Sequence, residues 1–549
     1  QAEIDGKPAS IAAREPNGLV AVDVPAGHHT VGIHFGSTPL RRAADAISVL
    51  TAIGLVVWAV AVKKELKETR ETKETVALTK PPSSLLSPIS LISLLLLRAV
   101  YLDNFPNPFS NTPFDGATVA GVATPLSVNF DHRLALIGLD LPHATARSGD
   151  AFDFNLYWRP LDAPLDADYS ISAHLIDASG GLFGQADSQH PGGLPTSRWR
   201  GDQYALDHHR LLILPGTPPG AYRLVAGVYR FDTGASLSLR DDNDIPQGTT
   251  TTLAQIVVTR PTRYPTNAEL SPSVLLDGPL GPLTLVGYDL ANGAQPVAAG
   301  SPLSFTLYWR AGRDVPAERL YARFELVAAD GKMILSKDLP PARVDYPTTE
   351  WATGEAVRAP QTIQIPADAP AGKVRLQLSL IDEAGSFVAG PIALSKIEIV
   401  APQRSTERPH AGHPLDVVFG GAIRLLGYDL APEALTIGQP FKLTLYWESI
   451  APVAQSYTVF THLLDSDNHI RAQRDSPPLG GARPTTGWLP GEVLTDVYEL
   501  KVEPDAPAGS YAIEVGLYDG ASGQRLPVLD AAGQAGGDRV ILANLRLDR

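Results

Sequence analysis

The sequence contains no cysteine and only one methionine among its 549 residues. Without cysteine, the chain forms no disulfide, holds no thiolate-bound metal and has no cysteine nucleophile. Positive charge is also scarce, since 45 lysines and arginines stand against 59 aspartates and glutamates, which gives a formal net charge of −14. Phosphate backbones are bound through Lys and Arg, so this balance argues against a nucleic-acid-binding surface and suits a solvated, exported one.

Sequence motifs of catalysis are missing as well. The chain has no nucleophile elbow, HExxH pair or P-loop in a credible context, and no pair of carboxylates stands out as a glycosidase site. We therefore expect no catalytic residue and no cofactor in this chain. Glycine and proline, at 48 residues each, are abundant, and this favours many short strands separated by turns.

A threefold internal repeat organises most of the chain. Four short motifs recur in the same order in each copy. The copies read IGLDL, FNLYWR, PTSRW and PPGAY at 137–222, VGYDL, FTLYWR, PTTEW and PAGKV at 286–374, and LGYDL, LTLYWE, PTTGW and PAGSY at 426–511. The chain has seven tryptophans, and all except Trp58 fall as two per copy. Three tandem modules are the economical interpretation.

The modules are predicted to be β-sandwiches. In FTLYW, Phe305, Leu307 and Trp309 share one face of a strand because strand side chains alternate, so this tryptophan is expected in the core. Short strands separated by turns favour three tandem antiparallel immunoglobulin-like β-sandwiches. Their predicted ranges are 117–260, 274–400 and 415–549. Proline-rich polar segments at 259–273 and 401–414 are predicted to be semi-rigid spacers between them.

Two hydrophobic stretches precede the modules. Residues 43–62 and 85–102 are predicted to be transmembrane helices, since about 20 apolar residues cross a bilayer. The loop 63–84 between them carries six Lys or Arg residues against four Glu, and basic loops favour the cytoplasmic side. This topology places the modules on the extracytoplasmic side of a bacterial plasma membrane. The alternative is that one stretch is a buried helix of a soluble protein.

Residues 1–41 are predicted to be the tail of an extracytoplasmic β domain, with alternating strands near 20–24 and 31–35 joined by a turn. The segment VPAGHHTVGIHF, followed by TPLRRAADAIS and the first span, resembles the tail of bacterial multi-span membrane proteins of the YfhO type, related by label to 6-pyruvoyl-tetrahydropterin synthase. That resemblance covers about the first 65 residues. It implies a lipid-linked-sugar glycosyltransferase whose catalytic carboxylates lie in loops that this sequence does not contain, so no catalytic residue is carried over. Because the sequence begins with Gln1, we expect it to be a processed protein or the C-terminal part of a longer polypeptide, and we favour the second.

The repeat itself is similar to the tandem C-terminal modules that follow the spans of some bacterial glycosyltransferase-like membrane proteins. The segments LLGYDL, LTLYWE, PTTGWLPGE and DAPAGSYAIEVGLYD of the third copy carry this likeness. It covers about residues 120–549 and implies architecture more than activity.

Two sets of repeated aromatic residues are candidate ligand-binding positions. The tryptophan of each PTxxW motif is either an exposed ligand platform or a plug at one end of the sandwich, and we favour the plug. The tyrosine of each LYW motif points away from the core face and either binds sugars or packs against loops or the next module, and we favour packing. The candidates are Trp199, Trp351, Trp488, Tyr157, Tyr308 and Tyr446.

Titratable residues supply only weak candidates for a metal. Asp241, Asp242 and Asp244 form a dense acidic loop of the kind that calcium favours, although the spacing is not that of an EF-hand, and a solvated loop is the favoured interpretation. His174 and His462 occupy equivalent strand positions in the first and third copies, where the second copy has Glu325. Interior or edge positions in a strand explain these histidines without catalysis.

The sequence thus predicts a membrane-anchored, extracytoplasmic accessory or structural protein. Its expected partners are the lipid bilayer and an envelope glycan or membrane protein, and no nucleic acid. Two alternatives stay open, namely the C-terminal part of a membrane glycosyltransferase that uses lipid-linked sugars, and a structural subunit of a membrane or cell-surface assembly.

Overall fold

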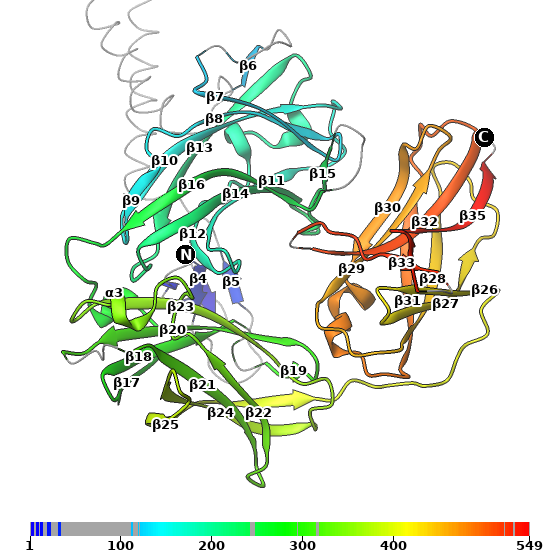
Figure 1. Ribbon diagram of the computed structural model, residues 1–549. Coiled ribbons are helices and arrows are strands. Elements are labelled where there is room, and N and C mark those ends of the chain that lie inside the picture. The colour runs from blue at the N-terminus through cyan, green and yellow to red at the C-terminus, as the bar shows by residue number, and fades with distance from the viewer. Residues whose placement is uncertain are drawn as a thin grey trace, which may run out of the picture. The chain divides into compact units, whose positions relative to one another are not determined.

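The computed structural model describes residues 121–547 apart from 242–246, 292, 294, 314–317, 521 and 531–532, together with Val119 and the backbone of six short earlier strands (Figure 1). The chain separates into two compact units, Gln1–Asn104 and Phe105–Arg549. The repeated modules all lie in the second unit.

In the first unit the structure describes five short strands. They are β1 (Ala2–Ile4), β2 (Lys7–Ala9), β3 (Ile11–Arg14), β4 (Leu19–Val22) and β5 (Val31–Ile33). Strands are therefore present at both positions of the predicted hairpin. Their partners differ from a hairpin, because β4 pairs with β3 and β5 pairs with β1.

The two predicted spans, residues 43–62 and 85–102, lie outside the described residues. Within the part of the chain that the structure does describe, no helix is both long enough and apolar enough to cross a membrane.

The mainly β fold predicted for the repeats is confirmed, and each copy places two faces of antiparallel strands around its own core. In the first module one face contains β7 (Thr124–Phe130), β8 (Leu134–Asp140), β10 (Ala151–Pro160) and β13 (Gln203–Ile213), and the other contains β12 (Leu182–Gln185), β11 (Tyr169–Ile176), β14 (Gly220–Arg230) and β16 (Thr250–Thr259). The short strand β9 (Thr145–Arg147) adds to β16 in parallel, β15 (Leu239–Arg240) pairs with β7, and β6 (Asn111–Pro113) pairs with β13.

The second and third modules repeat this order on two separate sheets, whereas pairing of β12 with β13 joins the two faces of the first module. The second has β17 (Val274–Leu280), β18 (Leu283–Leu290), β20 (Pro302–Ala311) and β23 (Ala356–Gln364) on one sheet, and β22 (Met333–Leu339), β21 (Leu320–Ala328), β24 (Gly372–Asp382), β25 (Phe387–Val400) and β19 (Val297–Ala298) on the other. The third has β26 (His413–Phe419), β27 (Ile423–Ala431), β28 (Pro440–Ser449) and β31 (Val493–Lys501), extended by β33 (Val528–Leu529) and β34 (Ala535–Gly537), facing β30 (Ile470–Ser476), β29 (Tyr457–Leu464), β32 (Gly509–Asp519) and β35 (Val540–Leu547).

The strand order refines the expected fold class. The first, second, third and sixth long strands of each module form one face, and the fifth, fourth, seventh and eighth form the other. The modules are therefore sandwich-like, and in the first and second modules a short strand, β9 or β19, pairs in parallel with the last long strand.

Each module has a separate hydrophobic core, and the tryptophan of its LYW motif lies inside it. Trp158, Trp309 and Trp447 are fully buried, one in each of the three core clusters. Along β10, the buried side chains of Phe152 and Phe154 alternate with exposed ones, as the sequence pattern predicts.

A β-bulge explains the glycine of the repeated GxDL motif. The register between the second and third strands shifts beside this glycine in every module, for example between Leu285 and Gly287. The first strand also passes close by, so a Cβ atom at Gly287 would overlap the carbonyl oxygen of Val274 and the ring of Pro272. The motif therefore requires glycine because of close backbone approach.

This crowding predicts that Gly287→Ala lowers the free energy of unfolding of the second module by about 1–3 kcal/mol, the usual range for overpacking. Urea unfolding followed by tryptophan fluorescence measures the loss. Gly509→Ala is the matched control, because a Cβ atom there meets nothing within 4 Å. Equal stability of the two variants would contradict the role of the bulge.

Candidate functional site

The aspartate of each GxDL motif anchors the segment that leads into its module. In the third module, one oxygen of Asp429 accepts the backbone N–H of Gly412 at 2.5 Å, and the other accepts the phenol of Tyr446 at 2.5 Å. The same arrangement occurs in the other two copies. Asp140 holds Ala123 N–H at 2.6 Å and Tyr157 at 2.5 Å, and Asp289 holds Ser273 N–H and Tyr308, both at 2.6 Å. We call Asp140, Asp289 and Asp429 the anchor carboxylates.

These bonds give a structural role to the three repeated tyrosines that were ligand candidates in the sequence. Burial and the neighbouring anchor carboxylate raise the pKa of Tyr157 and Tyr308 above the usual phenol range. The bond to Asp429, aided by burial, raises the pKa of Tyr446 to about 12. Tyr308 is fully buried and Tyr446 is nearly so, while Tyr157 is half-buried. Each hydroxyl is thus used inside the module.

The tryptophan of each PTxxW motif is buried. Trp199, Trp351 and Trp488 keep only 3%, 5% and 1% of their surface exposed, and each belongs to the core cluster of its module. The indole N–H of Trp351 donates to the carbonyl of Tyr346, and that of Trp488 to the carbonyl of Arg483, so each ring closes its own loop. This burial leaves no indole face for a ligand and agrees with a plug at the end of the sandwich.

The threonine of the same motif joins the loop to the opposite sheet. In the first module, the hydroxyl oxygen of Thr196 accepts the backbone N–H of Tyr169 at 2.7 Å, where β11 begins. Thr348 and Thr485 do the same for Leu320 and Tyr457, both at 3.0 Å. All three threonines are buried, so a non-polar replacement would leave a buried N–H without its partner.

The acidic residue after this motif binds an arginine of the preceding linker in the second and third modules. Glu355 is buried and faces Nε of Arg260 at 3.4 Å, while its other oxygen accepts the phenol of Tyr346 at 2.7 Å. Glu492 is buried and is paired with both Arg404 and Arg483. We call Arg260 and Arg404 the linker arginines.

The linkers are consequently docked on the modules, where the sequence suggested spacers. Before the second module, Thr266 caps the short helix α3 (Asn267–Leu270) in a capping box, and Leu270 packs on Tyr308 and Val286. Before the third, Arg408 donates from Nε to Oε1 of Glu448 at 3.2 Å and from Nη2 to Oε2 at 2.9 Å, a bidentate pair. The contacts that dock the linkers come mainly from their arginines.

The first module departs from this pattern. Its motif is one residue shorter, because Gly201 follows Trp199 by two positions whereas Gly354 follows Trp351 by three. Asp202 then points outward and pairs with Arg200 at 2.8 Å, and both side chains are mostly exposed. The chain before this module pairs instead by backbone, through β6 and Gln203–Ala205 of β13.

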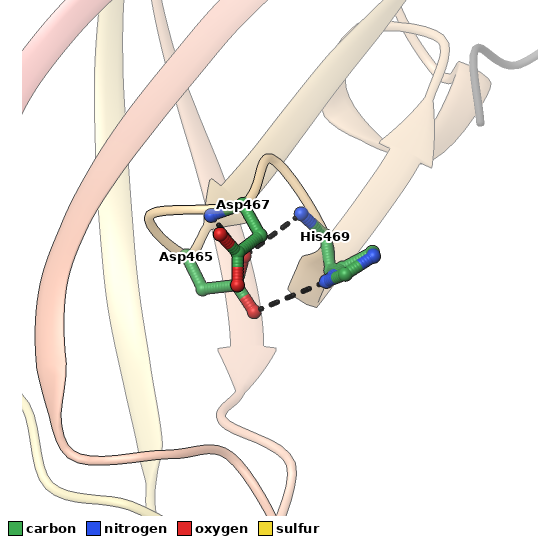
Figure 2. Close-up of side chains that lie close together, drawn as sticks. All are labelled: Asp465, Asp467 and His469. Carbon is green, nitrogen blue, oxygen red and sulfur yellow. Dashed lines mark hydrogen bonds and ion pairs between the residues drawn. The ribbon is translucent and has the colours of Figure 1, made fainter. Parts of the chain in front are cut away.

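A second repeated carboxylate lies at the turn between the fourth and fifth long strands. Figure 2 shows Asp465, Asp467 and His469, whose ligand atoms lie within 4.8 Å of one another. Asp465 accepts the backbone N–H groups of Asp467 and His469, both at 2.9 Å, and Nε of Arg471 at 2.8 Å. Burial opposes ionisation of Asp465, but these donors outweigh it and hold its pKa below the usual range.

The same turn forms in the first module without the second carboxylate or the histidine. Asp177 accepts the backbone N–H groups of Ser179 and Gly181 at 2.9 and 2.8 Å. An aspartate that binds the backbone two residues later is a common turn device. The cluster of Figure 2 is therefore explained by turn geometry.

The acidic loop predicted as a weak metal candidate lies largely outside the described residues, since these exclude 242–246 and with them Asp242 and Asp244. Asp241 is described, and its carboxylate accepts the side-chain amide of Gln247 at 2.9 Å.

The roles of the anchor carboxylates, the motif threonines and the linker arginines were not predicted from the sequence. A signal for each was present, because the aspartate and threonine occur in all three copies and an arginine occurs in both linkers. What the sequence did not contain was the pairing of linker with module, which depends on how the loops fold back.

No protein-family model matches the chain, and no curated protein matches it. Among solved structures, dimeric latent PorU from Porphyromonas gingivalis is similar at 10% identity and a TM-score of 0.19, over 76% of this chain and 34% of that one. The native conformation of E. coli alpha-2-macroglobulin is similar at 12% identity and a TM-score of 0.15, over 79% of this chain and 23% of that one. The chain thus spans about a third and a quarter of their lengths. At TM-scores this low, neither carries information about the fold or activity of this chain.

Loss of the anchor bond predicts an acid-dependent loss of stability. Tyr446→Phe should reduce protection of the β26–β27 region against hydrogen exchange by about 1–2 kcal/mol at pH 7, the range for a hydrogen bond to a charged group. The bond to Tyr446 and the Gly412 N–H lower the pKa of Asp429. This contribution is present above the unfolded carboxyl value of about 3.9 and disappears as the pH falls through the lower folded value, so the difference between variant and wild type shrinks in acid.

The control for this variant is Tyr457→Phe, whose hydroxyl makes only an exposed 3.3 Å bond to Gln455. If both substitutions change exchange equally, or if the Tyr446→Phe difference is constant with pH, the carboxylate is not the anchor.

Release of a linker arginine predicts exposure of its linker. Glu492→Gln removes the charge that holds Arg404, so trypsin should cleave the Arg404–Ser405 bond at least about tenfold faster, since breaking one partner of a buried ion pair costs several kcal/mol. The exposed pair of Glu499 with Lys442, at 3.2 Å, supplies the control Glu499→Gln. Cleavage at the wild-type rate in Glu492→Gln would show that the linker is held by other contacts.

Proposed function

We propose that this chain is a membrane-anchored, extracytoplasmic accessory protein whose three modules form a non-catalytic presenting or spacing array. The observation that carries the proposal is the use of the repeated residues. In each described module they close the sandwich and attach it to the chain in front of it. A repeated signature devoted to attachment suits a protein whose task is to hold modules in series.

The membrane part of the proposal rests on sequence. Residues 43–62 and 85–102 have the length and apolar character of spans, and the basic loop 63–84 between them favours the cytoplasm. With that topology, all three modules face the outside. A glycan or a membrane protein of the envelope is the partner we propose for the exposed surfaces of the array.

The resemblance of residues 1–65 to YfhO-type proteins favours a second proposal, in which the chain is the C-terminal part of a membrane glycosyltransferase for lipid-linked sugars. The sequence feature in its favour is VPAGHHTVGIHF followed by a hydrophobic span. In that protein the modules would still be the accessory part. The mass of the native polypeptide distinguishes the two proposals, because the transferase requires a long additional membrane domain.

The absence of cysteine allows a direct test of topology. Lys396→Cys places a thiol on an exposed position of β25, and Thr72→Cys places one in the loop 63–84. A membrane-impermeant maleimide should label the first variant in intact cells and the second only after permeabilisation, with the cysteine-free wild type as the blank. The reverse pattern, or labelling of both variants in intact cells, would contradict the proposed topology.

A further inference from the structure

A buried histidine joins three strands of the third module. His462 on β29 is 1% exposed, and its ring lies between carboxylates on the two neighbouring strands. Its Nδ1 is 2.9 Å from Oε1 of Glu514 on β32, and its Nε2 is 3.1 Å from Oδ1 of Asp475 on β30. A carboxylate oxygen accepts and does not donate, so both ring nitrogens must carry a proton for both bonds to exist. The geometry therefore describes an imidazolium.

The charges around the ring fit this protonation state. Nη1 of Arg539 lies 2.9 Å from Oε2 of Glu514, so this carboxylate has a cation on each side. The guanidinium of Arg525 lies 4.3 Å above the ring of Phe460, which stacks on His462, and 3.7 Å from Asp538. The phenol of Tyr518 borders the same small hollow, of about 10 Å³, which is too small for more than a single water molecule.

The other modules lack this arrangement at the equivalent position. His174 of the first module faces one carboxylate, Asp187, at 3.1 Å, and a third of its side chain is exposed. Val225 occupies the position of Glu514 there, opposite His174 on β14. In the second module, Glu325 stands in place of the histidine and accepts the amide of Gln377 at 2.8 Å. The second carboxylate and the burial are therefore particular to the third module.

We propose that His462 is a protonation-dependent lock that holds β30, β29 and β32 of the third module together and releases them as the pH rises. When the imidazolium loses a proton, one of its two carboxylates loses its donor, and the buried charge of Glu514 and the partly buried charge of Asp475 are left on either side of a neutral ring. An unpaired buried charge is strongly destabilising. Loss of this proton therefore weakens the second sheet of the third module and leaves the other two modules unaffected.

The sign of the pH effect follows from the two shifts. Burial lowers the pKa of His462, but Asp475 and Glu514 outweigh it and raise the value above the usual one. This stabilisation is complete below the unfolded value of about 6.5 and is lost as the pH rises through the folded value. Burial opposes ionisation of Glu514, but His462 and the arginines hold its pKa below its usual range, so its contribution is lost only in acid. The third module should be most stable between these two limits.

Calorimetric unfolding of the full chain in detergent, from pH 5 to pH 10, tests the lock. In the wild type, one transition should move down by at least about 5 °C as the pH rises from neutral to alkaline, the shift that a loss of one to two kcal/mol produces in a domain of this size. In His462→Gln that transition should be lower at neutral pH and should no longer move with alkaline pH. His174→Gln is the matched control and should keep the wild-type profile.

A second variant keeps the proposal testable if His462→Gln does not fold. Glu514→Gln retains the histidine but removes one carboxylate, so the alkaline fall should begin at a lower pH, closer to the value of an ordinary histidine. A wild-type transition that is flat with pH, or an unchanged alkaline fall in either His462→Gln or Glu514→Gln, would overturn the lock.

Discussion

The structure of the repeated region depends on the carboxylate at the end of the second strand of each module. A bulge brings the first strand unusually close there, and the chain leading into the module presents a backbone N–H that needs an acceptor. One oxygen of Asp289 receives that N–H, and the other receives the phenol of Tyr308 on the third strand. The anchor carboxylate thus fixes the segment that leads into the module and the orientation of the tyrosine, both next to the bulge. Glycine is required at the bulge because the first strand leaves no room for a Cβ atom.

The end of the sandwich near the PTxxW motif is covered in one way in the second and third modules and in another way in the first. In the second and third modules, the buried glutamate after the PTxxW motif binds a cation from the linker, and this brings the linker onto the sheet. In the first module the motif is shorter, Asp202 turns to solvent, and a strand from the preceding chain takes over by backbone pairing. A buried carboxylate is stable only with donors around it. The shorter motif of the first module, which exposes Asp202, is therefore compatible with a preceding segment that supplies no arginine to it.

Much of the fold follows from the sequence by period and repetition. The alternation in FTLYW predicts the buried Trp309, and the recurrence of four motifs predicts three similar β modules. The strand order cannot be predicted in this way, because the alternation shows which face of a strand is buried but not which strands are neighbours. The candidate sites show the same division. Repetition of the PTxxW motif favoured a plug for Trp488, which is buried, whereas the bond from Tyr446 to Asp429 depends on how a strand bulges, and this leaves no local signal in composition.

The docking of the linker arginines has a consequence for the order in which the protein is made. Arg404 belongs to the chain before the third module, yet its carboxylate partner, Glu492, lies 88 residues later. Because translation proceeds from the N-terminus, each linker arginine is synthesised before the module that contains its carboxylate partner. The natural heritable unit of this array is therefore a linker together with the module that follows it, and a duplication or recombination that cuts just in front of the first strand would separate a buried anion from its cation.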